Sequence, residues 1–196
     1  VAKPGKRNIT VNSSDAGAFV RSLGVFDNAV GGELALTATI DESLPSRPLS
    51  GKVGIDTFKV VNAPVLTQIL TFGSLTGMAD LLKGDGISFA RFEAPFALQD
   101  GRLEIERASA FGPALGITLE GRLDREQGQV EMRGTLVPAY TLNSVLGNIP
   151  LLGNLFVGRE GEGIFAITYA VNGPVSEPTV TVNPLSALAP GFLRSI

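Results

Sequence analysis

Apolar and polar residues alternate through much of the chain between residues 87 and 137. Leu103 and Ile105 alternate with Glu104 and Glu106, and the same period of two returns twice further along. Successive side chains of a β-strand point to opposite faces, so this pattern gives each strand one apolar and one polar face. Sheets with one dry and one wet face are typically antiparallel. The pattern therefore predicts an antiparallel meander over this part of the chain.

The N-terminal part predicts a strand, a helix and a second strand. Residues 8–12 are β-prone, and Ser14 or Asp15 is suited to cap a helix that Gly24 ends. Residues 33–40 alternate like a half-buried strand. The helix between the two strands has apolar residues at positions i, i+3, i+4 and i+7: Ala16, Phe19, Val20 and Leu23.

Three further segments complete the predicted elements. Residues 164–171 are apolar on both parities, which predicts a strand covered on both faces. Residues 178–183 predict one more short strand, and 184–193 a final apolar turn or helix. The apolar positions change parity near Arg91, which predicts a bulge or a twist there.

Two windows without a charged residue, 60–79 and 134–158, interrupt the strand pattern. The second window has the length of a bilayer-spanning helix, about 20 residues. Its prolines, such as Pro150, and its asparagines would leave polar groups unsatisfied in hydrocarbon. An ungapped alignment of the two windows pairs Pro64 with Pro138 and favours an internal duplication. Both windows predict apolar helical material that lies on the sheet.

These elements predict one α+β domain over 1–196: a curved, mainly antiparallel, open and groove-like sheet with two or three apolar helical insertions on one face. Residues 1–7 are expected to form a linker, since Lys3, Lys6 and Arg7 stand beside Pro4 and Gly5. A chain of 196 residues is long enough for a sizeable core. The first residue is not Met, and we expect the domain to be excised from the C-terminal part of a longer protein.

Composition removes several classes of function. The formal net charge of −3 offers no basic surplus for nucleic acid. The chain has neither Cys nor His, so it lacks thiolate chemistry, the commonest general base and the commonest transition-metal ligand. The alternation places the paired carboxylates Glu104 and Glu106 on the wet face as solvated charges. The acidic residues Asp80, Asp85, Glu160 and Glu162 have no calcium-loop spacing. We expect no cofactor, no metal and no enzyme activity.

The apolar helical residues leave two interpretations. They pack on the dry face as core, or they border an open groove whose uncovered apolar surface binds a ligand. On the second interpretation the candidate lining residues are Leu142, Val145, Leu146, Ile149, Leu152, Leu155, Phe156, Leu70, Leu75 and Met78.

Five sequence motifs carry a resemblance to a family. They are Gly134-Thr-Leu-Val-Pro-Ala-Tyr-Thr-Leu-Asn-Ser-Val-Leu-Gly-Asn-Ile-Pro-Leu-Leu-Gly, Gly161-Glu-Gly-Ile-Phe, Val180-Thr-Val-Asn-Pro-Leu-Ser-Ala-Leu-Ala-Pro-Gly, Ile9-Thr-Val-Asn-Ser-Ser-Asp-Ala-Gly and Leu75-Thr-Gly-Met-Ala-Asp-Leu-Leu. From Asn8 onward the chain resembles the C-terminal region of AsmA-like proteins of Gram-negative envelopes, the wider group that includes TamB and YhdP.

This resemblance implies a periplasmic domain of an inner-membrane-anchored protein whose long β-rich body forms an apolar groove. It implies passive movement of phospholipid between the inner and outer membranes or maintenance of the outer-membrane barrier, with acyl chains on the dry face and no catalytic residues. The alternative is a structural or docking module that caps the groove or binds an outer-membrane or envelope protein. An enzyme acting on envelope glycan is a more distant third reading.

Overall fold

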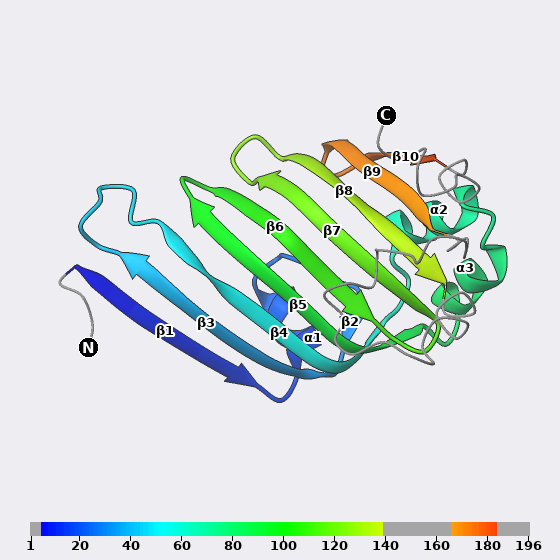
Figure 1. Ribbon diagram of the computed structural model, residues 1–196, viewed down its shortest axis with the longest axis horizontal. Helices are drawn as coiled ribbons and strands as arrows, with labels where there is room; N and C mark the ends of the chain where they lie inside the picture. The colour runs from blue at the N-terminus through cyan, green and yellow to red at the C-terminus, as the bar shows by residue number, and fades with distance from the viewer. Residues whose placement is uncertain (1–4, 139–165, 184–196) are drawn as a thin grey trace, which may run out of the picture.

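A computed structural model describes residues 5–138 and 166–183, and in these ranges the chain forms ten strands and three helices (Figure 1). The elements are β1 (Lys6–Ser13), α1 (Ala16–Ser22), β2 (Ala29–Val30), β3 (Glu33–Asp41), β4 (Leu49–Val60), α2 (Pro64–Phe72), α3 (Thr76–Lys83), β5 (Ile87–Gln99), β6 (Arg102–Phe111), β7 (Leu115–Asp124), β8 (Gln129–Pro138), β9 (Ile167–Pro174) and β10 (Thr179–Asn183).

All ten strands belong to one antiparallel sheet. Its order is β1-β3-β4-β5-β6-β7-β8-β9-β10, with the short β2 paired to β4 outside this path. Neighbours in the sheet are therefore mostly neighbours in the chain, and β1 and β10 form its two edges (Figure 1). The predicted fold class, an α+β domain with a curved, open, antiparallel sheet, is confirmed.

The register of the strands places apolar side chains beside apolar side chains. Leu34 on β3 pairs with Ile55 on β4, and Ile55 pairs with Phe92 on β5. The opposite face of the same strands carries the polar and charged residues. We call these surfaces the apolar face and the polar face.

The irregularity predicted near Arg91 is present. Ile55 and Phe58 both lie on the apolar side although they are three residues apart, and Thr57 between them has a φ of 53°. Across the ladder Phe89 stacks on Phe58 with ring centroids 5.3 Å apart. A shift of register then follows between β5 and β6, after Glu93. Both irregularities keep large apolar side chains on the face that the helices cover.

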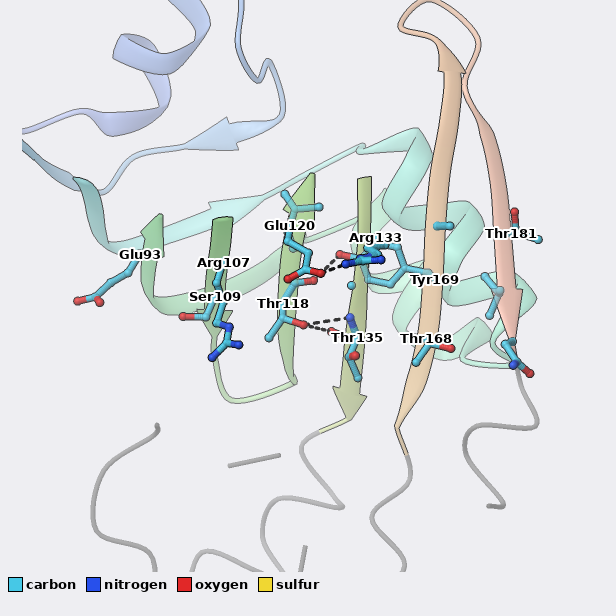
Figure 2. A pocket seen from close by; sticks show the side chains of 15 residues that line it. Glu93, Arg107, Ser109, Thr118, Glu120, Arg133, Thr135, Thr168, Tyr169 and Thr181 are labelled. Carbon is cyan, nitrogen blue, oxygen red and sulfur yellow. Dashed lines mark hydrogen bonds and ion pairs between the residues drawn. The ribbon is translucent and has the colours of Figure 1, made fainter. Parts of the chain in front are cut away.

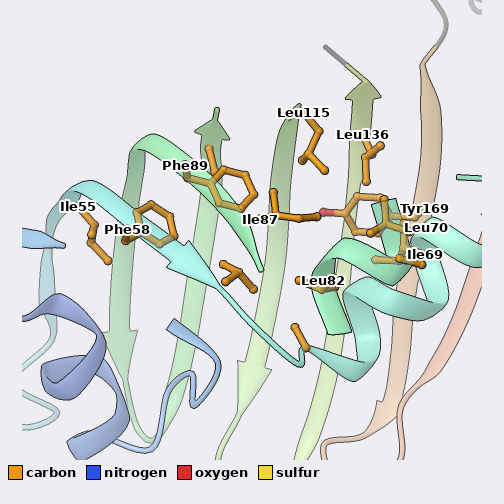
Figure 3. Packing of buried hydrophobic residues seen from close by; sticks show 14 of the residues in the cluster. Ile55, Phe58, Ile69, Leu70, Leu82, Ile87, Phe89, Leu115, Leu136 and Tyr169 are labelled. Carbon is orange, nitrogen blue, oxygen red and sulfur yellow. The ribbon is translucent and has the colours of Figure 1, made fainter. Parts of the chain in front are cut away.

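Helices α2 and α3 link β4 to β5 and cover one end of the apolar face (Figure 3). Helix α3 contacts β5, the next strand in the chain, whereas α2 contacts β10, the last strand of the sheet. The two helices together therefore span the strands from β5 to β10. The sheet must bend around the helices for both contacts to form. Their interface contains the most completely buried large side chains, among them Leu70, Leu82, Ile87, Leu115, Leu136 and Ile167.

Helix α1 lies on the same face, further along the sheet. Of the two caps that the sequence offers, Asp15 is the one used, since its carboxylate accepts a hydrogen bond from the Ala18 N–H at 3.0 Å. At the other end of the helix, the Arg125 guanidinium in the β7–β8 turn donates to the Leu23 carbonyl oxygen at 3.3 Å. Helix α1 therefore connects the β3–β4 side of the face with the β7–β8 turn.

Two expectations are corrected by the structure. Residues 1–7 are not all linker, because β1 begins at Lys6, whose ammonium lies 3.7 Å from the Asp41 carboxylate. Strand β9 is not covered on both faces along its length, because Thr168 and Asn172 are exposed while Ile167, Tyr169 and Val171 are buried. The window 139–158 and the segment 184–193 lie outside the described residues, so the predicted duplication stays a prediction.

Candidate functional site

The strongest candidate is a row of aliphatic side chains on the apolar face that no helix of the described structure buries. Its members come from five successive strands and are paired one to the next: Ile40, Leu49, Leu98, Leu103 and Leu123. All five are partly exposed, and none belongs to the buried cluster or to the residues packed against it. We call this set the outer row.

A second row lies beside the outer row, one step closer to the helices. It contains Phe96 and Ile105, which pair with each other and are also partly exposed. Gly51 precedes them and Gly121 follows them at the same level of the sheet. Because neither glycine has a side chain, the apolar surface is recessed on both sides of Phe96 and Ile105.

Three of the candidate lining residues of the sequence analysis lie within the described residues, and none of the three belongs to the outer row. Leu70 is wholly buried, with an exposed fraction of 0%, because α2 turns it into the core, so it is not a lining residue. Leu75 and Met78 are partly buried and pack against the same cluster. The remaining candidates fall outside the described residues: Leu142, Val145, Leu146, Ile149, Leu152, Leu155 and Phe156.

Sequence reasoning missed the outer row, although it found the strands that carry it. The alternation around Leu103 shows that this residue faces the dry side, but not which residues lie next to it. Whether side chains on five strands are adjacent depends on the register of the four ladders between those strands. The register of each ladder depends in turn on its connecting turn and on any bulge. The signal that the sequence does offer is an apolar residue close to each side of a turn: Ile40 and Leu49 flank the turn between β3 and β4, and Leu98 and Leu103 flank the turn between β5 and β6.

Several ion pairs join neighbouring strands on the polar face. Arg133 Nε lies 2.7 Å from Glu120 Oε1, and Arg122 pairs with Glu131. Glu93 accepts from Lys52 and Arg91, and these two hydrogen bonds, that of Lys52 foremost, lower the pKa of its carboxyl group. Such exposed pairs contribute little stability each, but they keep this face in water.

A polar hollow of about 940 Å³ lies over β5 to β10 on this face (Figure 2). One row of hydroxyl and amide side chains crosses it, one from each of five strands: Ser109, Thr118, Thr135, Thr168 and Asn183. The Thr135 N–H donates to the Thr118 hydroxyl at 3.0 Å. The hollow offers hydrogen-bonding groups, and it is distinct from the outer row, which is on the opposite face.

Three candidate acid–base groups are either exposed or already hydrogen-bonded: Glu104, Glu106 and Tyr169. Glu104 and Glu106 are both exposed, so neither sits in an apolar cleft that would hold a proton. Burial raises the pKa of the Tyr169 phenol, whose hydroxyl is already engaged as a donor to the Thr118 carbonyl oxygen. Within residues 5–138 and 166–183 no cluster of three or more acidic side chains is arranged to hold a metal ion.

In the same ranges no helix has the length and apolar character that a membrane-crossing helix requires. Comparison with family models, with curated proteins and with solved structures finds no match to this chain.

Proposed function

We propose that this domain holds phospholipid acyl chains on its apolar face, as a non-catalytic part of a protein that moves phospholipid between the inner and outer membranes or maintains the outer membrane. The sequence motifs that resemble AsmA-like proteins support a periplasmic setting in an inner-membrane-anchored protein of a Gram-negative bacterium. In this mechanism acyl chains leave water for the sheet and no covalent bond changes.

The observation that carries the proposal is the outer row. Its five side chains span four strand spacings, roughly 19 Å at about 4.8 Å per spacing. One leaflet of a bilayer is about 15 Å of hydrocarbon, half of the ~30 Å core. A single acyl chain laid across the strands therefore covers most of the length of the row.

The chemistry of the two faces fits such a ligand. Burial of a methylene group contributes about 0.8 kcal/mol, so a chain on the row gains from each carbon that it removes from water. The ion pairs of the polar face, such as Arg133–Glu120, hold that side of the sheet in solvent. A lipid on this sheet keeps its head group at an open rim, because the apolar face offers no polar partner.

Lipid retention tests the proposal. We expect phospholipid to co-purify with the protein and to be detected by native mass spectrometry. Leu103→Glu places a carboxylate within the outer row, between Leu98 and Leu123, and is expected to reduce bound lipid at least tenfold. Ala35→Glu is the matched control, because Ala35 is exposed on the polar face of β3. Circular dichroism checks that both variants fold. Equal lipid in the two variants, or none in the unmodified protein, would contradict the proposal.

A docking module is the second candidate, favoured by one observation: α2 and α3 seal their end of the apolar face completely, with Leu70 and Leu82 wholly buried. A domain that closes a groove needs such a sealed end. A photo-crosslinking residue at position 103, in place of Leu103, separates the two functions in cells. Lipid adducts support acyl binding, and protein adducts alone support docking to an envelope protein.

A further inference from the structure

We propose that the turn after α1, which carries Leu23, Val25 and Phe26, contacts the surface of a phospholipid bilayer. We call these three residues the apolar tip. The inference rests on the proposed function in one respect: it names where lipid would enter the outer row. The contact itself can be measured without any bound lipid.

The apolar tip presents three neighbouring apolar side chains to solvent. The exposed fractions of Leu23, Val25 and Phe26 are 47%, 46% and 40%. The backbone beneath them is satisfied, since the Val25 N–H donates to the Val20 carbonyl oxygen at 3.2 Å and Gly24 takes a φ of 62°. The hydrogen-bonded C-terminus of α1 thus fixes the backbone of the tip, with the three side chains directed toward solvent.

The apolar tip also lies beside the outer row. The hydrogen bond from Arg125 to the Leu23 carbonyl oxygen joins the tip to the β7–β8 turn. Leu123, the last member of the outer row, is two residues before Arg125 in the chain. The Arg125 hydrogen bond thus places the backbone of the tip at the turn that follows β7, the last strand of the outer row.

The charges around the apolar tip suit a bilayer surface. Arg21, one turn before the tip, donates to the Ala29 carbonyl oxygen, and Arg125 lies on the other side. Asp27 is the only acidic residue between Ala16 and Gly32. Two guanidinium groups beside exposed apolar side chains match the phosphates and acyl boundary of a membrane interface.

A protein partner fits this surface less well. A stable protein interface buries about 800 Å² on each side, well beyond the area of three side chains. A bilayer needs no complementary shape, and binding to it grows with the apolar area inserted and with attraction to anionic lipid. We therefore commit to the bilayer as the occupant.

The chain has no Trp, so a single introduced Trp reports its own surroundings. Phe26→Trp is expected to shift its emission to the blue on vesicles of phosphatidylglycerol and phosphatidylcholine, and to be quenched by brominated acyl chains. Phe72→Trp on α2 is the matched control, because Phe72 is 55% exposed but belongs to the opposite end of the face. No shift for Phe26→Trp, or an equal shift for both, overturns the inference.

A second variant keeps the two proposals apart. Replacing all three residues of the apolar tip by Ser is expected to weaken vesicle binding, measured by flotation, at least tenfold. Unchanged flotation overturns the membrane contact. Loss of lipid from Leu103→Glu with normal flotation supports both proposals, whereas a protein that floats but never carries lipid defeats only the proposed function.

Discussion

The Tyr169 hydroxyl on β9 donates a 2.6 Å hydrogen bond to the Thr118 carbonyl oxygen on β7, two strands away. The phenol reaches that oxygen by crossing over Gly134, its direct partner on β8. At this level the β7–β8 ladder is open, and the Thr118 hydroxyl takes the Thr135 N–H instead. Side chains thus join β7 to β8 and β9 at the level where the backbones of β7 and β8 do not pair.

Gly134→Ala is expected to destabilise the protein by about 1–3 kcal/mol, as overpacking typically does. A Cβ at this position would overlap the Thr118 carbonyl oxygen and lie 2.6 Å from the Tyr169 hydroxyl. Urea unfolding followed by circular dichroism measures the change. Gly54→Ala on β4 is the control, since its nearest neighbours would be 3.9 Å away. Equal stability of the two variants would show that the crossing is not tightly packed.

The buried phenol predicts a titration. Burial raises the pKa of Tyr169, so the folded state keeps the phenol proton at a pH where the unfolded chain has lost it. This contribution to stability is complete below the ordinary value near 10 and is lost as the pH rises above it. In a Tyr140→Phe variant the only phenol is Tyr169. Its absorbance at alkaline pH is expected to change together with unfolding, and ionisation in the folded protein near pH 10 would refute this.

Glu93→Gln is expected to lower stability at neutral pH by less than about 1 kcal/mol, because its partners are on an exposed face. The pKa of Glu93 is lowered when the protein is folded, so its contribution is present above the ordinary carboxyl value and disappears as the pH falls. The unfolding free energies of variant and parent should therefore converge in acid. Glu106→Gln, at an exposed position on β6, is the comparison, and a constant difference at all pH values would argue against the ion pairs.

The buried core and the outer row should respond differently to truncation. Leu82→Ala removes a wholly buried side chain and is expected to cost about 2–5 kcal/mol. Leu103→Ala removes a partly exposed one and is expected to cost roughly 1 kcal/mol or less. Urea midpoints of the two variants provide the measurement. A large loss at Leu103 would mean that the outer row is core.

Much of the fold follows from local sequence pattern. The alternation around Leu103 and Ile105, the cap at Asp15 and the change of parity near Arg91 each correspond to an observed element. These features depend on neighbours within a few residues, which is why the sequence predicts them. The meander order also needs no long-range information, because successive strands pair directly.

The candidate site depended on distant residues and was harder to predict. The helical spacing of Leu70 predicts a lining residue, but α2 is covered by strands that lie about a hundred residues later in the chain. The Tyr169–Thr118 bond likewise joins residues from β9 and β7 that no local pattern connects. Burial of a helix face and pairing across several strands are properties of the assembled sheet.

The contact between α2 and β10 also constrains the order in which the chain folds. During synthesis α2 and its apolar residues emerge well before β9 and β10, which cover them. Until those strands dock, Ile69 and Leu70 remain exposed to water, and contacts so distant in sequence form slowly. The growing chain therefore passes through a partly folded state in which the apolar surface of α2 is exposed, and such a state is prone to aggregation. Truncation before residue 179 is expected to leave the protein in that state.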